Sequence, residues 1–289
     1  MSEPELSFLD SLNVSNKSVR KPFFLILYGA ANVGKSGMCL NAPSPFFVAL
    51  ESGTDWLPAP KFVNGKGEPI AARTVDQAYD MLKWLLNRKN RDTLASPVET
   101  VIFDSLGFFE AMIYSDIIKK YPLTTGKNPI QVKSIVDLGY DGMGYAIDYW
   151  QRLLSAVESF KKQGINVIFI THSTTANTTS PDGKSSKEIV MALQKYGKHD
   201  VPELLARACD YCYYMSSEIE TTKVGAGTWA KNVGTAKGTS RTVITTRRTS
   251  LFFAKTRPIN EELIPDTYYY DIYDRNDVQK QIFNDILTA

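Results

Sequence analysis

The chain has 289 residues, of which 43% are hydrophobic and 22% charged, an ordinary globular composition that excludes a largely disordered protein. Lysine and arginine exceed aspartate and glutamate by 33 − 31 = 2 residues, so the protein as a whole is not a polycation. Apolar runs stay at strand length, three cysteines give no disulfide framework, and the acidic start MSEPELSFLD does not resemble a signal peptide. We therefore expect a soluble, cytoplasmic protein without a membrane segment.

The first part of the chain alternates between apolar runs of strand length and helical patterns. Before it, residues 1–20 are polar without a sustained period and predict a flexible arm. The predicted strands are Lys21–Gly29, Pro45–Leu50, Thr100–Phe103 and Ile165–Ile170. The predicted helices are Ser36–Asn41, a helix that starts at Thr74, Phe108–Tyr121 and Tyr145–Gln163. Pro122–Gly139 is polar and is expected to be an irregular loop. This alternation is typical of crossover units in a parallel sheet with helices on both faces.

The second part of the chain lacks this alternation. Ser173–Lys198 is polar and is expected to be mostly flexible loop, and Val201–Ala208 is predicted to be a short helix. The later predicted strands, expected to be antiparallel, are Tyr211–Met215, Thr242–Thr246 and Leu251–Ala254. A terminal helix is predicted over Asn276–Leu287. The sequence thus predicts an α/β fold: a mainly parallel central sheet flanked by helices, with antiparallel strands added toward the C-terminus.

Residues 29–36 read GAANVGKS and match the phosphate-binding pattern G-x-x-x-x-G-K-[ST] in full, between a predicted strand and a predicted helix. Glycine at 29 and 34 permits close backbone approach, and the loop amides can cradle phosphate oxygens. Lys35 would carry positive charge to the β and γ phosphates, and the Ser36 hydroxyl would ligate Mg²⁺. The predicted ligands are therefore ATP and Mg²⁺. The predicted nucleotide-binding residues are Gly29, Ala30, Ala31, Asn32, Val33, Gly34, Lys35, Ser36 and Gly37.

Three more polar side chains follow predicted strands. Asp104 ends the run VIFD, where a carboxylate can hold Mg²⁺ together with Ser36. Glu51 follows the second strand and can orient or deprotonate the attacking water, and His172 follows the fourth and can sense the γ-phosphate. The plainer interpretations are a turn-forming aspartate, a solvated glutamate and a packed histidine. The predicted catalytic residues are Lys35, Glu51 and His172.

Together the four strand ends GAANVGKS, VALESG, VIFDS and FITHS resemble the RecA-like P-loop NTPase core. They look most like the phage-encoded RecA-like ATP-binding proteins of the single-strand annealing and recombination group. The resemblance implies that Glu51 activates water, that Asp104 carries the metal role, and that His172 relays nucleotide state to a DNA loop. It also matches Ala254–Arg257 to a segment that ends the core in the phage group. It implies a RecA-like ATPase domain over 21–275, a C-terminal helix over 276–289, a homo-oligomeric ring or filament, and the host cytoplasm if the protein is phage-encoded.

From Thr221 to Asn260 the chain has eight Lys or Arg and no Asp or Glu, the local charge expected of a surface that contacts a phosphate backbone. A tryptophan in this segment could stack on an unpaired base. The candidate contacts to single-stranded DNA are Lys184, Lys187, Trp229, Lys231, Arg247 and Arg248. The alternative is a solvated hairpin with Trp229 packed beneath it. Lys255 and Arg257 are candidates for subunit-interface or phosphate contacts, with fold stabilisation or DNA contact as the alternative.

The predicted function is an ATP-binding, Mg²⁺-dependent ATPase that acts on single-stranded DNA in recombination, annealing or repair. Two alternatives stay open: a small-molecule or nucleotide kinase, and a non-hydrolysing ATP-dependent assembly accessory. A kinase would need an arginine-bearing lid, and Pro122–Gly139 contains only Lys127 and Lys133. A pure binder would not need Glu51. The pair Cys209-x-x-Cys212 is interpreted as ordinary buried cysteine, because zinc would need a second pair.

Overall fold

The computed structural model describes residues 21–120, 132–179, 185–218, 221–224, 231–234, 241–249, 251–257, 261–271 and 273–289. The predicted arm over 1–20 lies outside these residues. Within the described ranges, no helix has both the length and the apolar character needed to span a bilayer.

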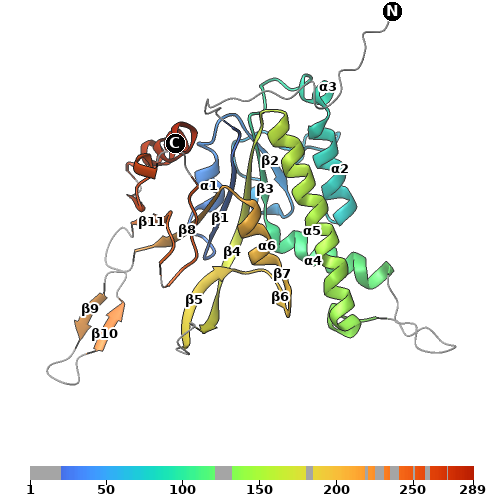
Figure 1. Cartoon of the computed structure of the whole chain (residues 1–289). Helices are drawn as coiled ribbons and strands as arrows, with labels where there is room; N and C mark the ends of the chain where they lie inside the picture. The colour runs from blue at the N-terminus through green and yellow to red at the C-terminus, as the bar shows by residue number, and fades with distance from the viewer. Residues whose placement is uncertain are drawn as a thin grey trace, which may run out of the picture.

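One large sheet organises the molecule (Figure 1), with its main strands in the order β12-β11-β8-β1-β4-β3-β2 and β5 paired to the outer part of β4. Its strands are β1 (Phe24–Gly29), β2 (Pro45–Ala49), β3 (Thr100–Asp104), β4 (Asn166–Thr179), β5 (Ser185–Met191), β8 (Tyr211–Ser217), β11 (Thr242–Thr245) and β12 (Thr267–Tyr270). The neighbours from β8 to β2 are parallel, and β11 is antiparallel to both β8 and β12. The parallel strands, numbered along the chain, have the spatial order 5-1-4-3-2. This arrangement confirms the predicted fold class, a RecA-like core with antiparallel strands added toward the C-terminus.

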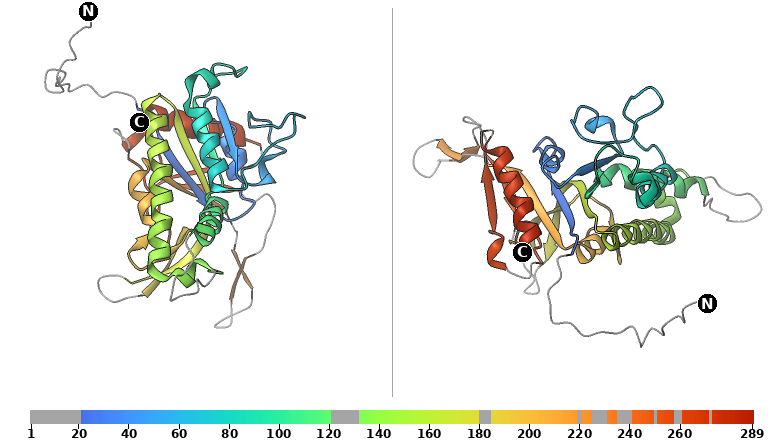
Figure 2. Two further views of the ribbon diagram at one scale, coloured as in Figure 1. Left: turned by 90° about the vertical axis from the view of Figure 1, so that its right-hand side faces the viewer. Right: turned by 90° about the horizontal axis from the view of Figure 1, so that it is seen from above.

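Two short hairpins stand apart from the large sheet. The first joins β6 (Lys195–Tyr196) to β7 (His199–Asp200), and the second joins β9 (Thr221–Val224) to β10 (Lys231–Gly234). The β9–β10 hairpin projects away from the sheet in Figure 1 and in the left view of Figure 2.

Helices cover both faces of the sheet (Figure 2). They are α1 (Lys35–Cys39), α2 (Val75–Leu86), α3 (Arg88–Arg91), α4 (Leu106–Lys120), α5 (Gly139–Lys162), α6 (Val201–Ala208) and α7 (Arg275–Thr288). Because side chains alternate along a strand, Phe24 and Ile26 enter the core beneath α2, α4 and α5, whereas Leu25 and Leu27 enter the core shared with α1 and α7. Helix α2 begins as the sequence predicts, with the Thr74 hydroxyl accepting a hydrogen bond from the Gln77 N–H.

The prediction of a flexible loop over Ser173–Lys198 is wrong for most of its described residues. β4 continues past the sheet to Thr179 and pairs antiparallel with β5 from Ser173↔Met191 to Thr179↔Ser185. The stretch is polar but rich in β-branched threonine, which suits a solvated two-stranded ribbon, and strand propensity outweighs its polarity. Residues 180–184 lie outside the described part.

Three smaller expectations also need correction. Leu251–Ala254 makes one isolated bridge, Ile189↔Phe252, with another at Cys212↔Lys255 just after it, and is not a strand. β8 is parallel to β1 and antiparallel only to β11. Within the predicted irregular loop, Ser134 and Asp137 form a capping box for a 3₁₀ turn, η2 (Ile135–Leu138), that leads directly into α5. Helix α5 itself begins at Gly139, six residues before its apolar pattern becomes regular, and its N-cap residue Leu138 makes no side-chain capping bond.

Candidate nucleotide-binding site

The phosphate-binding motif connects β1 to α1 at the carboxyl edge of the sheet. Gly29 pairs with Met215 of β8 so closely that a Cβ at position 29 would lie 2.0 Å from the Met215 carbonyl oxygen. Asn32 and Gly34 have left-handed backbones, with φ of 62° and 91°. Such turns direct successive N–H groups to one side and make an anion-binding concavity, and residues 30–32 and 34 are exposed. The loop therefore has the form that a phosphate cradle requires.

Lys35 lies at the centre of this loop. Its side chain is only 6% exposed, and Nζ donates to the carbonyl oxygens of Gly29 (3.0 Å) and Ala30 (2.6 Å). Burial lowers the pKa of the ammonium, and the negative charges of Asp104 and Glu51 oppose that shift. No carboxylate in the described part of the chain pairs directly with this ammonium, and a cation held only by backbone carbonyls is suited to bind an incoming anion.

Ser36 and Asp104 form the candidate metal pair. The Ser36 hydroxyl donates to Asp104 Oδ2 at 2.5 Å. Burial raises the pKa of Asp104 to about 6; the Ser36 hydrogen bond and Lys35 oppose this, while Glu51 adds to it. A hydroxyl and a carboxylate are hard oxygen ligands of the kind Mg²⁺ takes when it also binds a nucleotide, so the donor set fits that ion.

Glu51 and His172 stand at the same edge. His172 lies opposite Gly29 in the β1–β4 register, and Glu51 comes two residues after Ala49, which pairs with Asp104. Partial burial and then the charge of Lys35 lower the pKa of His172, and Glu51 opposes them. The strand registers therefore place Glu51, Asp104 and His172 at the same edge of the sheet as the phosphate-binding loop.

Buried hydroxyls around the site are a feature that sequence analysis did not identify as functional. The hydroxyl oxygens of Thr54, Ser105 and Thr171 are buried and have no hydrogen-bond partner among the described residues. Each lies within three residues of Glu51, Asp104 or His172 along the chain. Buried polar atoms are nearly always satisfied, so unsatisfied ones here favour a site that takes up polar ligand atoms or water. Position directly after an apolar strand was the available signal for Ser105 and Thr171.

The β4–β5 hairpin connects the site to the C-terminal part of the chain. It starts beside His172, and the Tyr28 hydroxyl lies within hydrogen-bonding distance of the carbonyl oxygens of Ile189 (3.2 Å) and Phe253, which share its single O–H donor. Ile189 N–H donates to Leu251 O at 2.7 Å. Arg248 donates to the buried Glu188 carboxylate at 3.2 Å. The hairpin is therefore hydrogen-bonded to Arg248, Leu251 and Phe253.

The candidate DNA contacts separate into three groups. Lys187 is exposed on β5. Arg247 forms an ion pair with Asp266 (2.7 Å), and Arg248 forms one with Glu188, so both guanidinium groups already have acidic partners. The remaining candidates, whose side chains lie outside the described part of the chain, are Lys184, Trp229 and Lys231.

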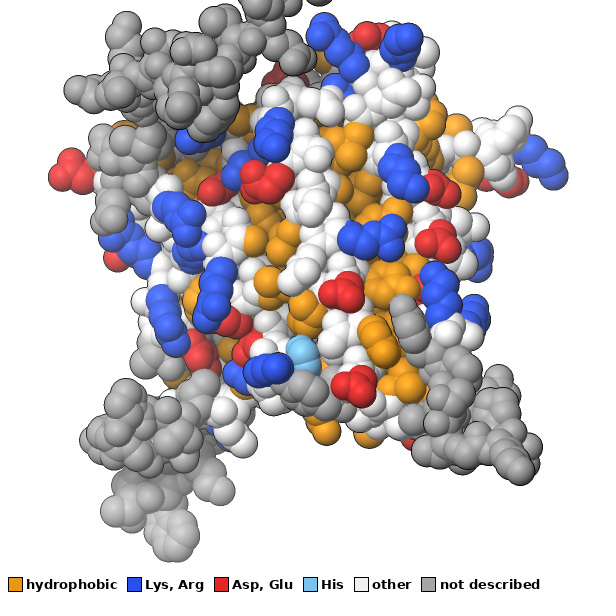
Figure 3. All heavy atoms as spheres, turned by 45° about the vertical axis from the view of Figure 1, so that its right-hand side comes forward, with side chains coloured by type: hydrophobic (Ala, Val, Ile, Leu, Met, Phe, Trp, Pro, Cys, Tyr) orange, Lys and Arg blue, Asp and Glu red, His pale blue; other side chains and the backbone are white. Residues whose placement is uncertain are grey.

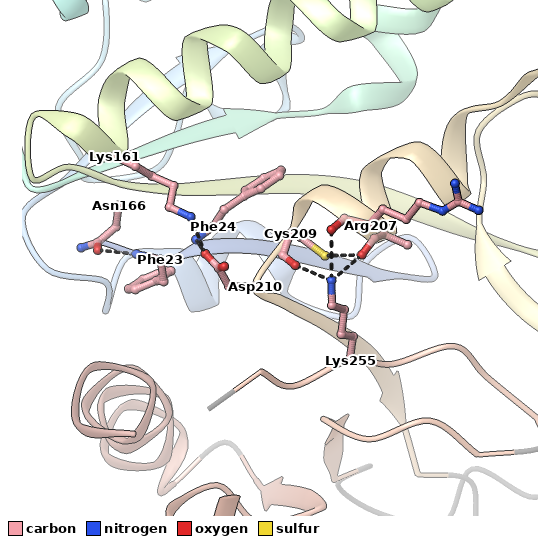
Figure 4. A network of polar contacts seen from close by, with 9 residues as sticks. Phe23, Phe24, Lys161, Asn166, Arg207, Cys209, Asp210 and Lys255 are labelled. Carbon is pink, nitrogen blue, oxygen red and sulfur yellow. Dashed lines mark hydrogen bonds and ion pairs between the residues drawn. The ribbon is translucent and has the colours of Figure 1, made fainter. Parts of the chain in front are cut away.

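Lys255 has a defined place in the fold (Figure 4). Its ammonium donates to the carbonyls of Ala206 (2.7 Å), Arg207 (3.3 Å) and Cys209 (2.6 Å), at the C-terminal end of α6. This arrangement satisfies carbonyls that a helix end leaves unpaired and favours the alternative of fold stabilisation for Lys255. Arg257, two residues later, is exposed.

The model of one protein family, described as AAA domain, matches residues 21–258. The chain belongs to this AAA domain family. No curated protein sequence matches it significantly. Among solved structures, it is similar to a KaiC-like protein from the hyperthermophilic archaeon Pyrococcus horikoshii OT3 (10% identity, TM-score 0.38, 80% of this chain and 81% of that one). It is also similar to the flagellar accessory protein FlaH from Methanocaldococcus jannaschii (13% identity, TM-score 0.32, 78% of each chain).

The match to the AAA domain family spans the whole candidate site, from the strand before the phosphate-binding loop to Arg257. Family membership and the site geometry agree on the general function: this is a P-loop protein of RecA-like fold whose phosphate-binding loop, lysine and hydroxyl–carboxylate pair suit a nucleotide with Mg²⁺.

Proposed function

We propose that this AAA domain protein binds ATP with Mg²⁺ and hydrolyses ATP, and that it couples hydrolysis to single-stranded DNA in recombination, annealing or repair. The observation that carries the ATPase proposal is the convergence of Lys35, the Ser36–Asp104 pair, Glu51 and His172 on one sheet edge. A pure nucleotide binder has no need of a carboxylate such as Glu51 beside the phosphate lysine.

Each group has a distinct chemical task in this proposal. The loop amides and Lys35 bind the phosphates, and Ser36 and Asp104 hold Mg²⁺, which when bound neutralises phosphate charge. Glu51 orients the attacking water and accepts its proton. His172 donates a hydrogen bond toward the γ-phosphate and lies at the base of the β4–β5 hairpin, so nucleotide state can alter the position of that hairpin.

The DNA part of the proposal rests on local charge and on connectivity. The hairpin that begins at His172 carries the exposed Lys187 and is bonded to residues 248–253, within the segment 221–260 that has no acidic residue. The β9–β10 hairpin of that segment projects from the body (Figure 1). In contrast, the helical face in Figure 3 has basic and acidic side chains interspersed, without a continuous patch of one sign. Nucleic acid is therefore expected at the hairpins.

The finer features of the proposal come from the resemblance of the strand-end motifs. They suggest a protein of the phage-encoded recombination group, working in the host cytoplasm as a homo-oligomeric ring or filament. In such an assembly the exposed Arg257 would contact a neighbouring subunit's phosphates, whereas Lys255 would hold the end of α6.

Steady-state ATP hydrolysis with and without an unstructured DNA oligonucleotide tests the proposal, with Lys35→Ala as the blank. We expect Mg²⁺-dependent turnover that rises at least several-fold with single-stranded DNA and less with duplex. Turnover that DNA does not change would refute the coupling and leave the ATPase. No turnover with retained ATP binding would support the assembly accessory, and phosphate transfer to a small acceptor would support the kinase.

A further inference from the structure

The turn after Glu51 determines where the Glu51 carboxylate lies. Glu51 is the N-cap residue of the 3₁₀ turn η1 (Ser52–Thr54), has an extended backbone and makes no side-chain capping bond. Its carboxylate lies along the turn instead: a Cβ at Gly53 would be 3.6 Å from Glu51 Cδ and 3.7 Å from Oε2. A movement of η1 therefore moves the proposed catalytic carboxylate with it.

One ammonium group holds this turn. Lys61 Nζ donates to the carbonyl oxygens of Thr54 (2.6 Å), Asp55 (3.0 Å) and Leu57 (2.8 Å), so all three of its N–H donors have acceptors within four residues of chain. These three acceptors are all backbone oxygens, so the ammonium holds the backbone of the turn rather than a side chain. The turn lacks any cap from Glu51, and its own short-range bonds are Asp55 N–H to Ser52 O and Leu57 N–H to Thr54 O.

The backbone of Lys61 is held in place as well as its ammonium group. The residue bridges Phe47 in the middle of β2, the last strand of the sheet order, and Phe47 N–H donates to Pro60 O at 2.9 Å. Leu57, on the other side of the tie, is 3% exposed and packs in the core beneath α1. Burial lowers the pKa of the Lys61 ammonium, with Asp55 opposing, as expected for a cation enclosed by the turn. The side chain thus connects the sheet edge to the loop that carries Glu51.

We propose that Lys61 is a positioning residue for ATP hydrolysis: by holding the 52–57 turn through three carbonyls, it sets the Glu51 carboxylate against the attacking water. This inference rests on the proposed function of Glu51. It predicts a defect in the hydrolytic step rather than in nucleotide binding, because the phosphate-binding residues Lys35 and Ser36 belong to a different loop.

Lys61→Met removes the ammonium and retains most of the aliphatic stem. We expect kcat to fall about 10-fold or more, since small displacements of a catalytic group cost that much, while the ATP dissociation constant stays within about 3-fold. Lys66→Met is the matched control, because Lys66 is exposed in the same excursion between β2 and α2 and only its backbone N–H donates, to Asn64. Lys61→Arg, which keeps the charge but replaces the compact ammonium with a planar guanidinium, should recover only part of the lost kcat.

A double-mutant comparison separates positioning from general weakening of the fold. If Lys61 acts through Glu51, Lys61→Met lowers kcat in the wild-type background and has no further effect on the residual rate of Glu51→Gln. An equal fall in both backgrounds, an unchanged kcat, or a rise in the ATP dissociation constant that accounts for the defect would overturn the positioning role while leaving the ATPase proposal intact. Absence of turnover in the wild-type protein would instead refute the proposed function, and full turnover in Glu51→Gln would remove Glu51 from its catalytic role; either result refutes this inference as well.

Discussion

The close approach of Gly29 to β8 makes a sharp prediction for Gly29→Ala. The new Cβ would lie 2.0 Å from the Met215 carbonyl oxygen, whereas Cβ contacts essentially never fall below 3.0 Å, so the two strands must separate by at least 3.0 − 2.0 = 1.0 Å at this point. Gly29 and Met215 are the last register pair of β1 and β8. The nearest atoms to the new Cβ are backbone atoms of Met215, so no rotation of a side chain can relieve the clash.

The cost follows from this displacement. A 1 Å separation breaks the terminal hydrogen bonding of the pair, at about 1 kcal/mol, and adds overpacking strain of about 1–3 kcal/mol. We therefore expect Gly29→Ala to lose roughly 2–4 kcal/mol of unfolding free energy, or roughly 3–7 °C in Tm for a chain of this size. It should also weaken ATP binding, because the Gly29 carbonyl accepts from Lys35 and both would shift.

Gly37→Ala is the matched control within the same motif. Nothing lies within 4 Å of a Cβ built at Gly37, and the residue is inside α1, where alanine is favoured over glycine by about 0.5–1 kcal/mol. Thermal denaturation of both variants without nucleotide should therefore give shifts of opposite sign. A Tm for Gly29→Ala within about 1 °C of the wild-type value, or an equal loss in Gly37→Ala, would refute the close-approach argument.

Four other predictions test the remaining assignments. Glu51→Gln should bind ATP normally and hydrolyse it about 100-fold more slowly, and near-normal turnover would remove Glu51 from the role of base. Asp104→Asn should lose Mg²⁺-dependent binding yet stabilise the nucleotide-free protein by roughly 1–3 kcal/mol at pH 7. Burial raises the Asp104 pKa to about 6, so the protonated carboxyl contributes stability to the wild-type protein at pH 4, and this contribution is lost as the pH rises through 6. Denaturation at pH 4 and at pH 7 should therefore show the greater stability of the Asn variant only at pH 7. Lys255→Met should cost about 1–3 kcal/mol of stability without changing kcat at saturating ATP, whereas a fall in kcat with unchanged Tm would favour a role in the neighbouring ATP site. Lys187→Ala should weaken single-strand binding and reduce the slope of its salt dependence by about 1, measured by fluorescence anisotropy over a salt series, and an unchanged slope would place the DNA elsewhere.

The parallel core and the strand-end residues were predictable because each depends on local sequence. Apolar runs of strand length that alternate with helical patterns specify crossover units, and the topology then brings the carboxyl ends of the strands to one edge. Glu51, Asp104 and His172 could therefore be named as a group from their positions alone. In the structure the charge of Glu51 contributes to the pKa shifts of both Asp104 and His172, as expected for groups at one shared edge.

The features that escaped prediction depend on partners distant in sequence. The β4–β5 hairpin looked like a loop because its polar threonines bury little, and its pairing and its bonds to residues 248–253 cannot be inferred from either segment alone. Lys255 was interpreted as a possible phosphate contact because nothing in the segment 254–257 reveals that three carbonyls at the end of α6 surround the ammonium. Lys61 carried no signal for the same reason, since a lysine that ties backbone is indistinguishable in sequence from one that is solvated.

Strand β4 belongs to two structures, the buried sheet and the solvated hairpin, and this explains how nucleotide binding could be coupled to the hairpin. Up to Ile170 the strand is buried between β1 and β3, and from Ser173 onward it forms the solvated hairpin with β5. His172 stands at the boundary, opposite Gly29 of the phosphate-binding loop. Because the inner half is locked in the sheet, a hydrogen bond gained or lost by His172 can be accommodated only on the outer side, where the backbone leads into the hairpin. A nucleotide-dependent change in amide hydrogen exchange confined to residues 173–191, and absent in His172→Ala, would be its direct signature.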